Sequence, residues 1–329
     1  MRNKVLKALL DNEGRFISGE TVSSSLGITR AAIWKHIKSL QQEGFIIETK
    51  PRLGYRLVRI PDILDRTTLL KSIDTIIMGR NLEIYDTIDS TNNRARELAL
   101  AEAPEGTLIV AETQLKGRGR LGRSWISPKG KGIWMSLVLR PDIPPDKAPG
   151  ITTLVAVAIR RALNQLTGLD IGIKWPNDII VNDRKLCGIL TEMYGDMDKI
   201  YYIVVGIGIN ANLEETDFPP ELTKTATSLY ISTGQAVDRR SVIVQIMKEI
   251  ENIYYQYIKY GDFDAILDEC RRYSVTLNKP VIVIGRDQEF EGFAINFDRD
   301  GSLLVKKKDG TITKVISGDV SVRGREGYV

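Results

Sequence analysis

The sequence predicts an α+β protein built from several domains. Three observations support this prediction. Apolar residues recur at helical spacing through the first 40 residues, and two alternating strand-like segments follow them. From about residue 82 to 260, strand-like apolar runs alternate with longer helical patterns, which is typical of a mixed α/β domain. After residue 280, five short strand-like segments are separated by turn signals such as Asp300-Gly301, which favours a small β-domain.

Composition narrows the class of protein. The 329 residues leave room for two or three domains, and 43% apolar with 27% charged residues is typical of a globular protein. No run approaches the ~18 apolar residues of a membrane span, so we expect a cytoplasmic protein without membrane contact. Two cysteines and one histidine exclude a disulfide framework and a Cys/His zinc site. Serine–histidine catalysis would depend on this one histidine, His36, which lies in the N-terminal segment that we assign to another role below.

Positive charge is concentrated at the N-terminal end. Residues 1–60 hold 11 Lys/Arg and 5 Asp/Glu, a balance of +6, whereas the rest of the chain sums to −2. We therefore expect the first domain, residues 1–62, to meet a polyanion.

The first domain has the pattern of a winged helix-turn-helix. Ser18 and Thr29 are positioned to cap two short helices joined at Gly27, and strands at 45–49 and 55–58 flank a basic turn. In such a module the later helix enters the major groove and the wing touches phosphates. The predicted DNA-binding residues are Thr29, Arg30, Ala31, Trp34, Lys35, Lys38, Lys50 and Arg52. A three-helix packing module with a solvated basic face is the alternative.

The segment from Gln114 to Trp125 carries four cations, Lys116, Arg118, Arg120 and Arg123, among three glycines. We call residues 114–132 the cationic loop. Glycines let backbone amides approach an anion, and arginine forks bind phosphate or carboxylate oxygens bidentately. The loop therefore predicts a phosphate-bearing ligand, which would order it, although a solvated basic loop has the same composition.

The glycine spacing in this loop is not a dinucleotide fingerprint. That fingerprint requires a helix to open directly after the glycines. Here Ser127-Pro128 and two more glycines follow, and then a strand-like run at 133–139. The phosphate loop ending in Gly-Lys-Ser/Thr is absent from the whole chain.

Three other segments of the central domain, residues 63–275, bear polar groups beside predicted strands. Asp89-Ser90-Thr91-Asn92 precedes a helix predicted from Arg94, where the simplest role of such a cluster is capping. Lys174 to Asp178 and Arg184 to Leu190 lie in a predicted hairpin turning at Asn182-Asp183, where Lys185 could be an edge lysine. A third segment, Val205 to Asn210, is an apolar strand broken by glycines. Helices are expected at 64–77, 149–166 and 239–260.

Together these motifs, in this order, resemble a known family. The chain is similar over essentially its whole length to the bifunctional biotin-protein ligases that also repress the biotin operon. The resemblance implies a central domain of the class II synthetase-like, biotin/lipoate ligase type. The five short strand-like segments at 276–329 suggest a small SH3-like β-barrel. The same resemblance implies an enzyme that joins biotin to ATP and passes biotin from biotinyl-5′-AMP to a lysine of a biotin carboxyl carrier protein.

The resemblance also implies the site residues. Lys185, Arg118 and Arg120 would stabilise the developing charge. The biotin-binding residues would be Ser90, Thr91, Asn92, Gln114, Gly117, Arg118, Gly119, Arg120, Lys185, Gly188 and Gly206. The nucleotide-binding residues would be Arg118, Arg120, Arg123, Trp125, Asn177, Asp178, Asn210 and Arg323. Asp178 would lie near Mg²⁺, and the segment from Asp217 to Leu229 would cover the adenine.

The implied ligands and partners follow. ATP with Mg²⁺ and biotin are the expected substrates, with no bound prosthetic group. The expected partners are the carrier protein of acetyl-CoA carboxylase, pyruvate carboxylase, operator DNA and a second copy of the chain, with dimerisation promoted by biotinyl-5′-AMP. Two alternatives stay open: a ligand-sensing regulator without catalysis, and a lipoate-type ligase.

Overall fold

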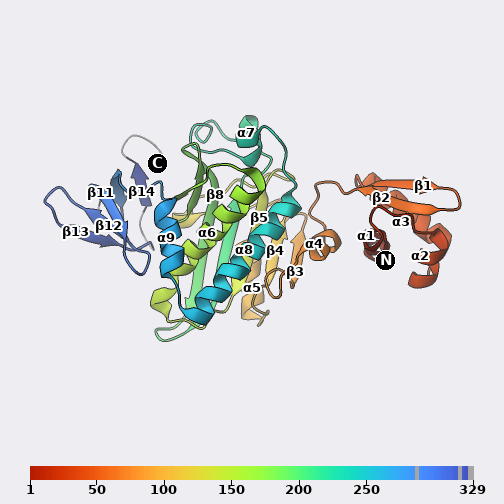
Figure 1. The fold of residues 1–329 in the computed structure, drawn as a ribbon, viewed down its shortest axis with the longest axis horizontal. Coiled ribbons are helices and arrows are strands. Elements are labelled where there is room, and N and C mark those ends of the chain that lie inside the picture. Colours follow the sequence, from red (N-terminus) through yellow and green to blue (C-terminus); the bar gives the residue numbers. More distant parts are fainter. Residues whose placement is uncertain (286–288, 318–320, 325–329) are drawn as a thin grey trace. The chain divides into compact units, whose positions relative to one another are not determined.

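The computed structural model describes residues 1–285, 289–317 and 321–324, and its chain forms two compact units (Figure 1). Unit 1 comprises residues 1–72, and unit 2 begins at Ile73. Among the described residues, none of the helices has the length and apolar character that crossing a membrane requires.

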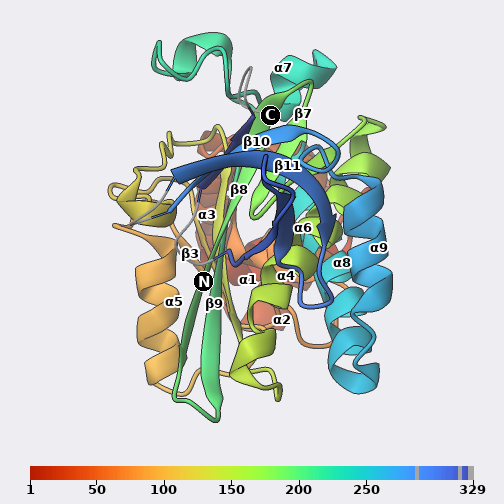
Figure 2. The ribbon, with the colours of Figure 1, turned by 90° about the vertical axis from the view of Figure 1, so that its left-hand side faces the viewer.

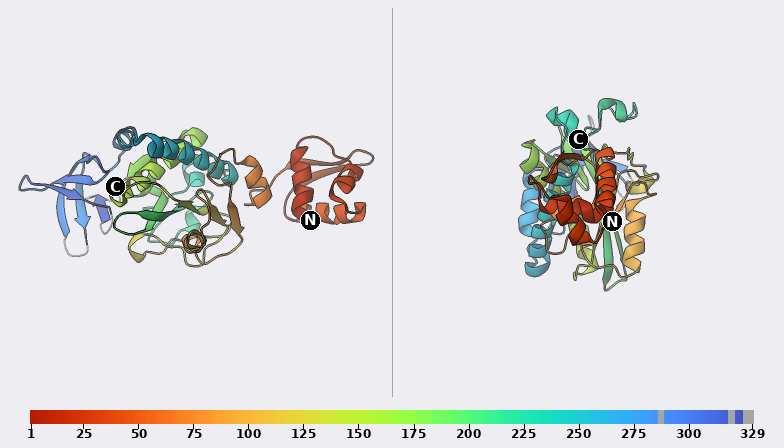
Figure 3. Two further views of the ribbon diagram at one scale, coloured as in Figure 1. Left: turned by 90° about the horizontal axis from the view of Figure 1, so that it is seen from below. Right: turned by 90° about the vertical axis from the view of Figure 1, so that its right-hand side faces the viewer.

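Unit 1 contains the predicted helix-turn-helix, followed by a hairpin (Figure 3). Its elements are α1 (Arg2–Asp11), α2 (Gly19–Leu26), α3 (Arg30–Gln42), β1 (Ile46–Lys50), β2 (Gly54–Arg59) and α4 (Arg66–Ser72). The side chains of Ser18 and Thr29 accept hydrogen bonds from the backbone N–H groups of Thr21 and Ala32, which starts α2 and α3. Gly27 ends α2 with φ +64°, a conformation that suits glycine.

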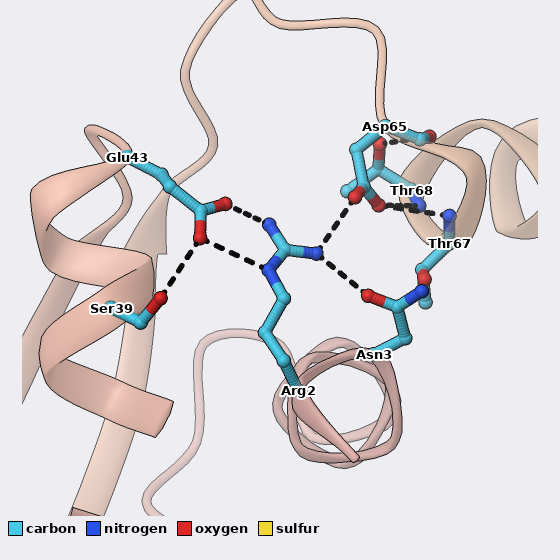
Figure 4. A network of polar contacts seen from close by, with 7 residues as sticks. All are labelled: Arg2, Asn3, Ser39, Glu43, Asp65, Thr67 and Thr68. Atoms are coloured by element: carbon cyan, nitrogen blue, oxygen red, sulfur yellow. Dashed lines mark hydrogen bonds and ion pairs between the residues drawn. The ribbon is translucent and has the colours of Figure 1, made fainter. Parts of the chain in front are cut away.

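One network of polar contacts joins both ends of unit 1 (Figure 4). The guanidinium of Arg2 donates to Glu43, just after α3, and to Asp65, 2.8 Å away. Asp65 also accepts from the backbone N–H groups of Thr67 and Thr68, so it caps α4. This arrangement fixes α4 against the helices of the same unit.

The helix expected at 64–77 is shorter than predicted, because α4 ends at Ser72. Beyond it, the carboxylate of Glu251 accepts hydrogen bonds from the backbone N–H groups of Ile76, Ile77 and Met78 at 2.7–3.0 Å. A side chain distant in sequence thus replaces the helical acceptors that these groups would otherwise need.

Unit 2 is centred on a seven-stranded mixed sheet of order β3-β4-β5-β9-β8-β7-β6, in which only β3 and β4 pair in parallel. Its strands are β3 (Leu82–Tyr85), β4 (Leu108–Ala111), β5 (Ile133–Leu139), β6 (Gly172–Lys174), β7 (Asp178–Val181), β8 (Arg184–Gly195) and β9 (Ile200–Ile209). The β7–β8 turn has positive φ at Asn182 and Asp183, as the predicted hairpin requires.

Helices cover both faces of this sheet (Figure 2). Helix α5 (Thr91–Leu100) packs on one face, and α6 (Pro149–Thr167), α8 (Arg239–Tyr260) and α9 (Asp264–Arg272) lie on the other. The apolar stripe predicted for 239–260 is buried at each of its positions, and α6 is buried over most of its length, although its C-terminal end includes the exposed Leu166. The remaining short helices are η1 (Arg120–Gly122), η2 (Pro145–Lys147), η3 (Glu215–Asp217) and α7 (Leu229–Thr233).

The C-terminal part of unit 2 is a five-stranded antiparallel sheet of order β13-β12-β11-β10-β14. Its strands are β10 (Pro280–Ile284), β11 (Glu289–Phe297), β12 (Leu303–Lys306), β13 (Ile312–Val315) and β14 (Ser321–Gly324). The strands agree with the prediction, except that Val320 lies outside the described residues. Over those residues the edge strands β13 and β14 do not pair with each other, so the expected closed barrel is not confirmed.

Candidate functional site

Unit 2 contains a cavity of about 630 Å³ above the central sheet. Its walls come from α5, the cationic loop, the β6–β7 hairpin, strands β8 and β9, the segment 213–226 and strand β14. Segments far apart in the sequence therefore converge on one space. This volume is in the range of small-molecule sites.

One end of the cavity is a polar pocket lined by Thr91, Asn92 and Gln114, and the buried Ser136 contacts the first two of them. The backbone N–H and hydroxyl of Thr91 donate to Gln114 Oε1 at 2.8 and 3.0 Å. The hydroxyl of Ser136 lies 2.7 Å from Thr91 Oγ1 and 2.6 Å from Asn92 Oδ1. Such a pocket offers donors and acceptors at fixed positions to the polar ring of a ligand. Ser90, the residue before α5, makes no side-chain cap hydrogen bond. Capping therefore does not explain the polar cluster at residues 90–92.

The cationic loop is closed by its own backbone. Gly119 N–H donates to Arg123 O at 2.7 Å, and Trp125 N–H donates to Gly117 O at 2.9 Å. A Cβ on Gly117 would lie 2.4 Å from the carbonyl oxygen of Trp125, so this position requires glycine. Strand β5, not an α-helix, follows the loop directly, which confirms that its glycines are not a dinucleotide fingerprint.

Two arginines of the loop have polar partners on other elements. Arg118 Nη2 donates to Asn93 Oδ1 at 2.7 Å and lies 3.6 Å from Glu192. Arg120 donates to Asn177 Oδ1 at 3.0 Å and also to the backbone carbonyl of Ser317. The loop is thus held across the cavity opening by contacts with α5, β8 and the C-terminal sheet region.

Lys185 projects into the cavity from β8. Its Nζ lies 2.6 Å from Asp178 Oδ1 and 5.2 Å from the ring centroid of Trp125. The backbone of the same residue exchanges hydrogen bonds with Thr225 and Thr227, which ties β8 to the segment at 212–228. We call this segment the second loop. These contacts place one ammonium group between an acidic and an aromatic side chain, where it can bind an anionic ligand.

Lys174 is a second cavity lysine, and it is only 5% exposed. Burial, together with the nearby charges of Lys185, Arg323 and Arg123, lowers the pKa of its ammonium group to about 8, although Asp178 has the opposite effect. Several positive charges therefore converge around one carboxylate. Such a cluster favours a ligand with several negative charges.

Glycines of β8 and β9 form the floor. A Cβ on Gly206 would lie 2.1 Å from Asn92 Oδ1, and a Cβ on Gly208 or Gly188 would lie 2.6 or 2.8 Å from the ring of Trp125. Gly206 thus makes space for the polar pocket, and the other two make space for the indole.

The second loop closes another side of the cavity through Phe218, Leu222 and Ala226. Lys131, at the end of the cationic loop, pairs with Glu214 at 2.9 Å and with Asp217 at 3.2 Å. The two loops are therefore linked directly.

Most of the residues predicted for ligand binding line this cavity. They are Thr91, Asn92, Gln114, Arg118, Gly119, Arg120, Arg123, Trp125, Asn177, Asp178, Lys185, Gly188, Gly206, Asn210 and Arg323. Ser90 and Gly117 do not line it, because Ser90 is buried beside the pocket and Gly117 is packed against Trp125.

Other residues that line the cavity were not assigned from sequence. Lys174, Trp175, Met135 and Gly208 are among them. The position of Lys174 and Trp175 at the end of a predicted strand, shortly before Asn177-Asp178, was the available signal. Met135 gives no such signal, because it resembles any apolar residue of a buried strand.

The expected Mg²⁺ position rests on one carboxylate. Among the described residues, no three His, Cys, Asp or Glu side chains converge as a protein-only metal site requires. Asp178 is paired with Lys185 at the cavity wall. Because Mg²⁺ often binds through one or two carboxylates, substrate phosphates and water, this donor set fits a nucleotide-bound Mg²⁺ better than a resident ion.

Unit 1 presents the predicted DNA-binding residues together. All eight of them, from Thr29 to Arg52, are exposed, and those after the Thr29 cap lie on α3 and on the wing. Trp34 is 56% exposed, with the ammonium of Lys38 5.7 Å from its ring centroid, whereas His36 is half-buried. An exposed cationic helix face beside a basic hairpin has the geometry of a DNA-contacting surface.

Comparisons with known proteins agree with this arrangement. Family models match the chain at residues 1–56 (HTH domain), 84–210 (Biotin/lipoate A/B protein ligase family) and 276–323 (Biotin protein ligase C terminal domain). The chain is 40% identical to the bifunctional ligase/repressor BirA of Bacillus subtilis, over 98% of each chain. It is 32% identical to that of Escherichia coli, over 98% of this chain and 97% of the relative. It also resembles the structure of a biotin protein ligase from Aquifex aeolicus in complex with biotin and ATP, with 29% identity and a TM-score of 0.65 over 74% of this chain and 99% of the other.

Proposed function

The chain belongs to the family of bifunctional ligase/repressor BirA proteins, and we propose from this that unit 2 activates biotin with ATP while unit 1 binds operator DNA. The observation that carries the proposal is the single cavity in which the polar pocket, the cationic loop, Lys185 and the second loop meet. Each part fits one portion of biotinyl-5′-AMP.

We assign the polar pocket to the ureido ring of biotin. A ureido group has both N–H donors and a carbonyl acceptor, and the pocket offers hydroxyl and amide groups that can serve either role. Thr91, Asn92 and Gln114 are held in place by hydrogen bonds to one another or to Ser136. Preorganised partners of this kind reduce the entropy that binding would otherwise cost.

The cations would act at the reacting groups. In the first step an oxygen of the biotin carboxylate attacks the α-phosphorus of ATP, and the bond to the bridging oxygen breaks, so pyrophosphate leaves. In the second, the amine of the carrier lysine attacks the biotinyl carbonyl carbon and AMP leaves. Arg118, Arg120 and Lys185 would stabilise negative charge as it develops on the phosphate and carboxyl oxygens. Lys174, Arg123 and Arg323 surround the space where further phosphates would lie.

The indole of Trp125 and the side chains of the second loop would enclose the adenine. Phe218, Leu222 and Ala226 supply apolar contacts opposite the glycine floor. Asp178 and the nucleotide phosphates would hold Mg²⁺, which supplies further charge neutralisation. Asn177 and Asn210, which line the same region, would orient the nucleotide.

The proposal extends to partners. The acceptors are a lysine of the biotin carboxyl carrier protein of acetyl-CoA carboxylase and that of pyruvate carboxylase, and biotinyl-5′-AMP promotes a homodimer that binds a two-fold operator. The activity belongs in the cytoplasm, where ATP and DNA are present. We also propose that the C-terminal sheet closes as an SH3-like barrel, because its five short antiparallel strands have the size of one.

A pyrophosphate-release assay tests the ligase activity. With ATP, biotin should support release, whereas lipoate and octanoate should not. Lys185→Gln should slow release by on the order of 10²–10³, the usual effect of losing one group that stabilises the transition state. Lys199→Gln, which removes an exposed lysine beyond the end of the same strand, is the matched control and should leave the rate unchanged. Release with lipoate but not biotin would support a lipoate-type ligase, and no release with any acid would support a sensor without catalysis.

A further inference from the structure

Glu192 contacts two parts of the cavity wall, helix α5 and the cationic loop, which belong to different segments of the chain. It is on β8, two residues beyond Leu190, which lines the cavity. Its carboxylate faces both Asn92 at the start of α5 and Arg118 of the cationic loop. No sequence motif singled it out, and the proposed ligase chemistry does not use it.

The contact with Asn92 is the stronger of the two. Asn92 Nδ2 donates to Glu192 Oε2 at 2.7 Å, and Asn92 is 5% exposed. A carboxylate that accepts from an amide fixes which end of the amide is the nitrogen. It thereby leaves Asn92 Oδ1 directed at Ser136, 2.6 Å away in the polar pocket. Gly206, opposite Leu190 in the sheet, leaves the space that this amide occupies.

The contact with Arg118 is weaker. Arg118 Nη2 lies 3.6 Å from Glu192 Oε1, and both side chains are about 40% exposed. Exposed ion pairs of this kind contribute little, because water screens them. The same Nη2 donates to Asn93, the neighbour of Asn92 on α5, so the loop arginine meets the pocket wall at two adjacent points.

We propose that Glu192 is a positioning residue with two functions: one carboxylate oxygen orients the Asn92 amide in the polar pocket, and the other holds Arg118 of the cationic loop. This inference rests on the proposed biotin site. It means that the pocket for one end of the ligand and the loop that covers the other end are connected through one carboxylate.

Two substitutions separate the two functions. Glu192→Gln keeps an oxygen that can accept from Asn92, but it replaces the charge facing Arg118 with a neutral group. Glu192→Ala removes both contacts. The matched control is Glu97→Gln, which removes an exposed carboxylate from α5 without touching Asn92 or Arg118.

The KM for biotin tests the function of Glu192 in the polar pocket. We expect the KM for biotin of Glu192→Gln to stay within about twofold of the wild-type value, and that of Glu192→Ala to rise about tenfold or more, the effect of losing a charge-assisted hydrogen bond to a buried group. The kcat at saturating biotin should change less than the KM in both variants. An equal rise in KM for both variants, or none for Glu192→Ala, would overturn the pocket function.

The rate of trypsin cleavage measures how firmly the cationic loop is held. Trypsin cleaves after Lys116, Arg118, Arg120 and Arg123, and mass spectrometry identifies the cleaved bond. In the ligand-free full-length chain, both variants should be cleaved there about two- to fivefold faster than wild type and Glu97→Gln, consistent with a weak ion pair. Unchanged cleavage of Glu192→Gln would contradict the loop function. Because wild type is assayed beside the variants, absence of biotin-dependent pyrophosphate release from wild type would identify a failure of the ligase proposal itself.

Discussion

Among single residues, Lys174 is the cavity lysine whose charge depends on burial. Lys174 is more deeply buried than Lys185, and its pKa is about 8. At pH 7 its ammonium group is therefore mostly protonated, and it loses its charge as the pH rises through 8. Burial makes the charged form of Lys174 unfavourable, and a bound anion would stabilise that form.

This pKa predicts that the KM for ATP depends on pH. The pKa of Lys174 is below that of an ordinary lysine, so the charge is present below pH 8 and is lost above it. The KM for ATP should therefore rise about two- to tenfold between pH 7 and 9, while the KM for biotin changes less. Lys174→Arg keeps its charge throughout this range and should abolish the rise.

Pyrophosphate-release kinetics at fixed ionic strength measure both KM values. Lys147→Arg, on η2 outside the cavity, is the control for the substitution itself. A rise that persists in Lys174→Arg would assign the pH dependence to another group.

At the scale of elements, strand β9 supports two different parts of the cavity wall. Gly206 faces the amide of Asn92, and Gly208, two residues along on the same face, lies under Trp125. The polar pocket and the indole are therefore separated along β9 by two residues, which is one period of a strand.

Two alanine substitutions should separate these roles. In Gly206→Ala the new methyl group would displace Asn92 and raise the KM for biotin about tenfold or more. In Gly208→Ala it would displace Trp125 and raise the KM for ATP instead. Each variant controls for the other, since both put one methyl group on the same strand, and thermal melting checks that both fold. If both raised the same KM, the division of the cavity would be wrong.

The accuracy of the sequence predictions varied between elements for physical reasons. The bounds of α8 were predicted at both ends, because its apolar stripe repeats over six turns. In the structure Asp238 and Gly261 cap this helix. The helix expected at 64–77 was too long, because its last residues donate to Glu251, about 175 positions away. Periodicity reports the local preference of a segment, and it contains no information about such distant acceptors.

The same limit applies to the cavity. The cationic loop was recognised because its charges and glycines are contiguous in sequence. Lys174 and Glu192 were not, since the burial of the first and the two contacts of the second exist only after β8, α5 and the loop meet. The hydrogen bond from Arg120 to the carbonyl of Ser317 belongs to this group as well.

For the whole molecule, dimerisation would couple the two proposed activities. If the adenylate orders the loops of unit 2 and thereby promotes a dimer, two copies of unit 1 become linked, and each can contact one half-site. The second half-site is then bound from within the complex rather than from solution, at a high effective concentration.

We therefore expect biotin plus ATP to raise operator affinity at least tenfold, measured by fluorescence anisotropy on a duplex selected from a random pool by the ligand-bound protein. Lys185→Gln should fail to respond to biotin plus ATP but should respond to added biotinyl-5′-AMP, because it cannot make the adenylate efficiently yet still carries the dimer surface.

Replacing Lys35 and Lys38 by alanine should weaken DNA binding and reduce the salt slope by about one for each phosphate that is no longer neutralised, without changing pyrophosphate release. Equal operator affinity with and without biotin plus ATP in the wild-type chain would refute the coupling, whatever the variants do.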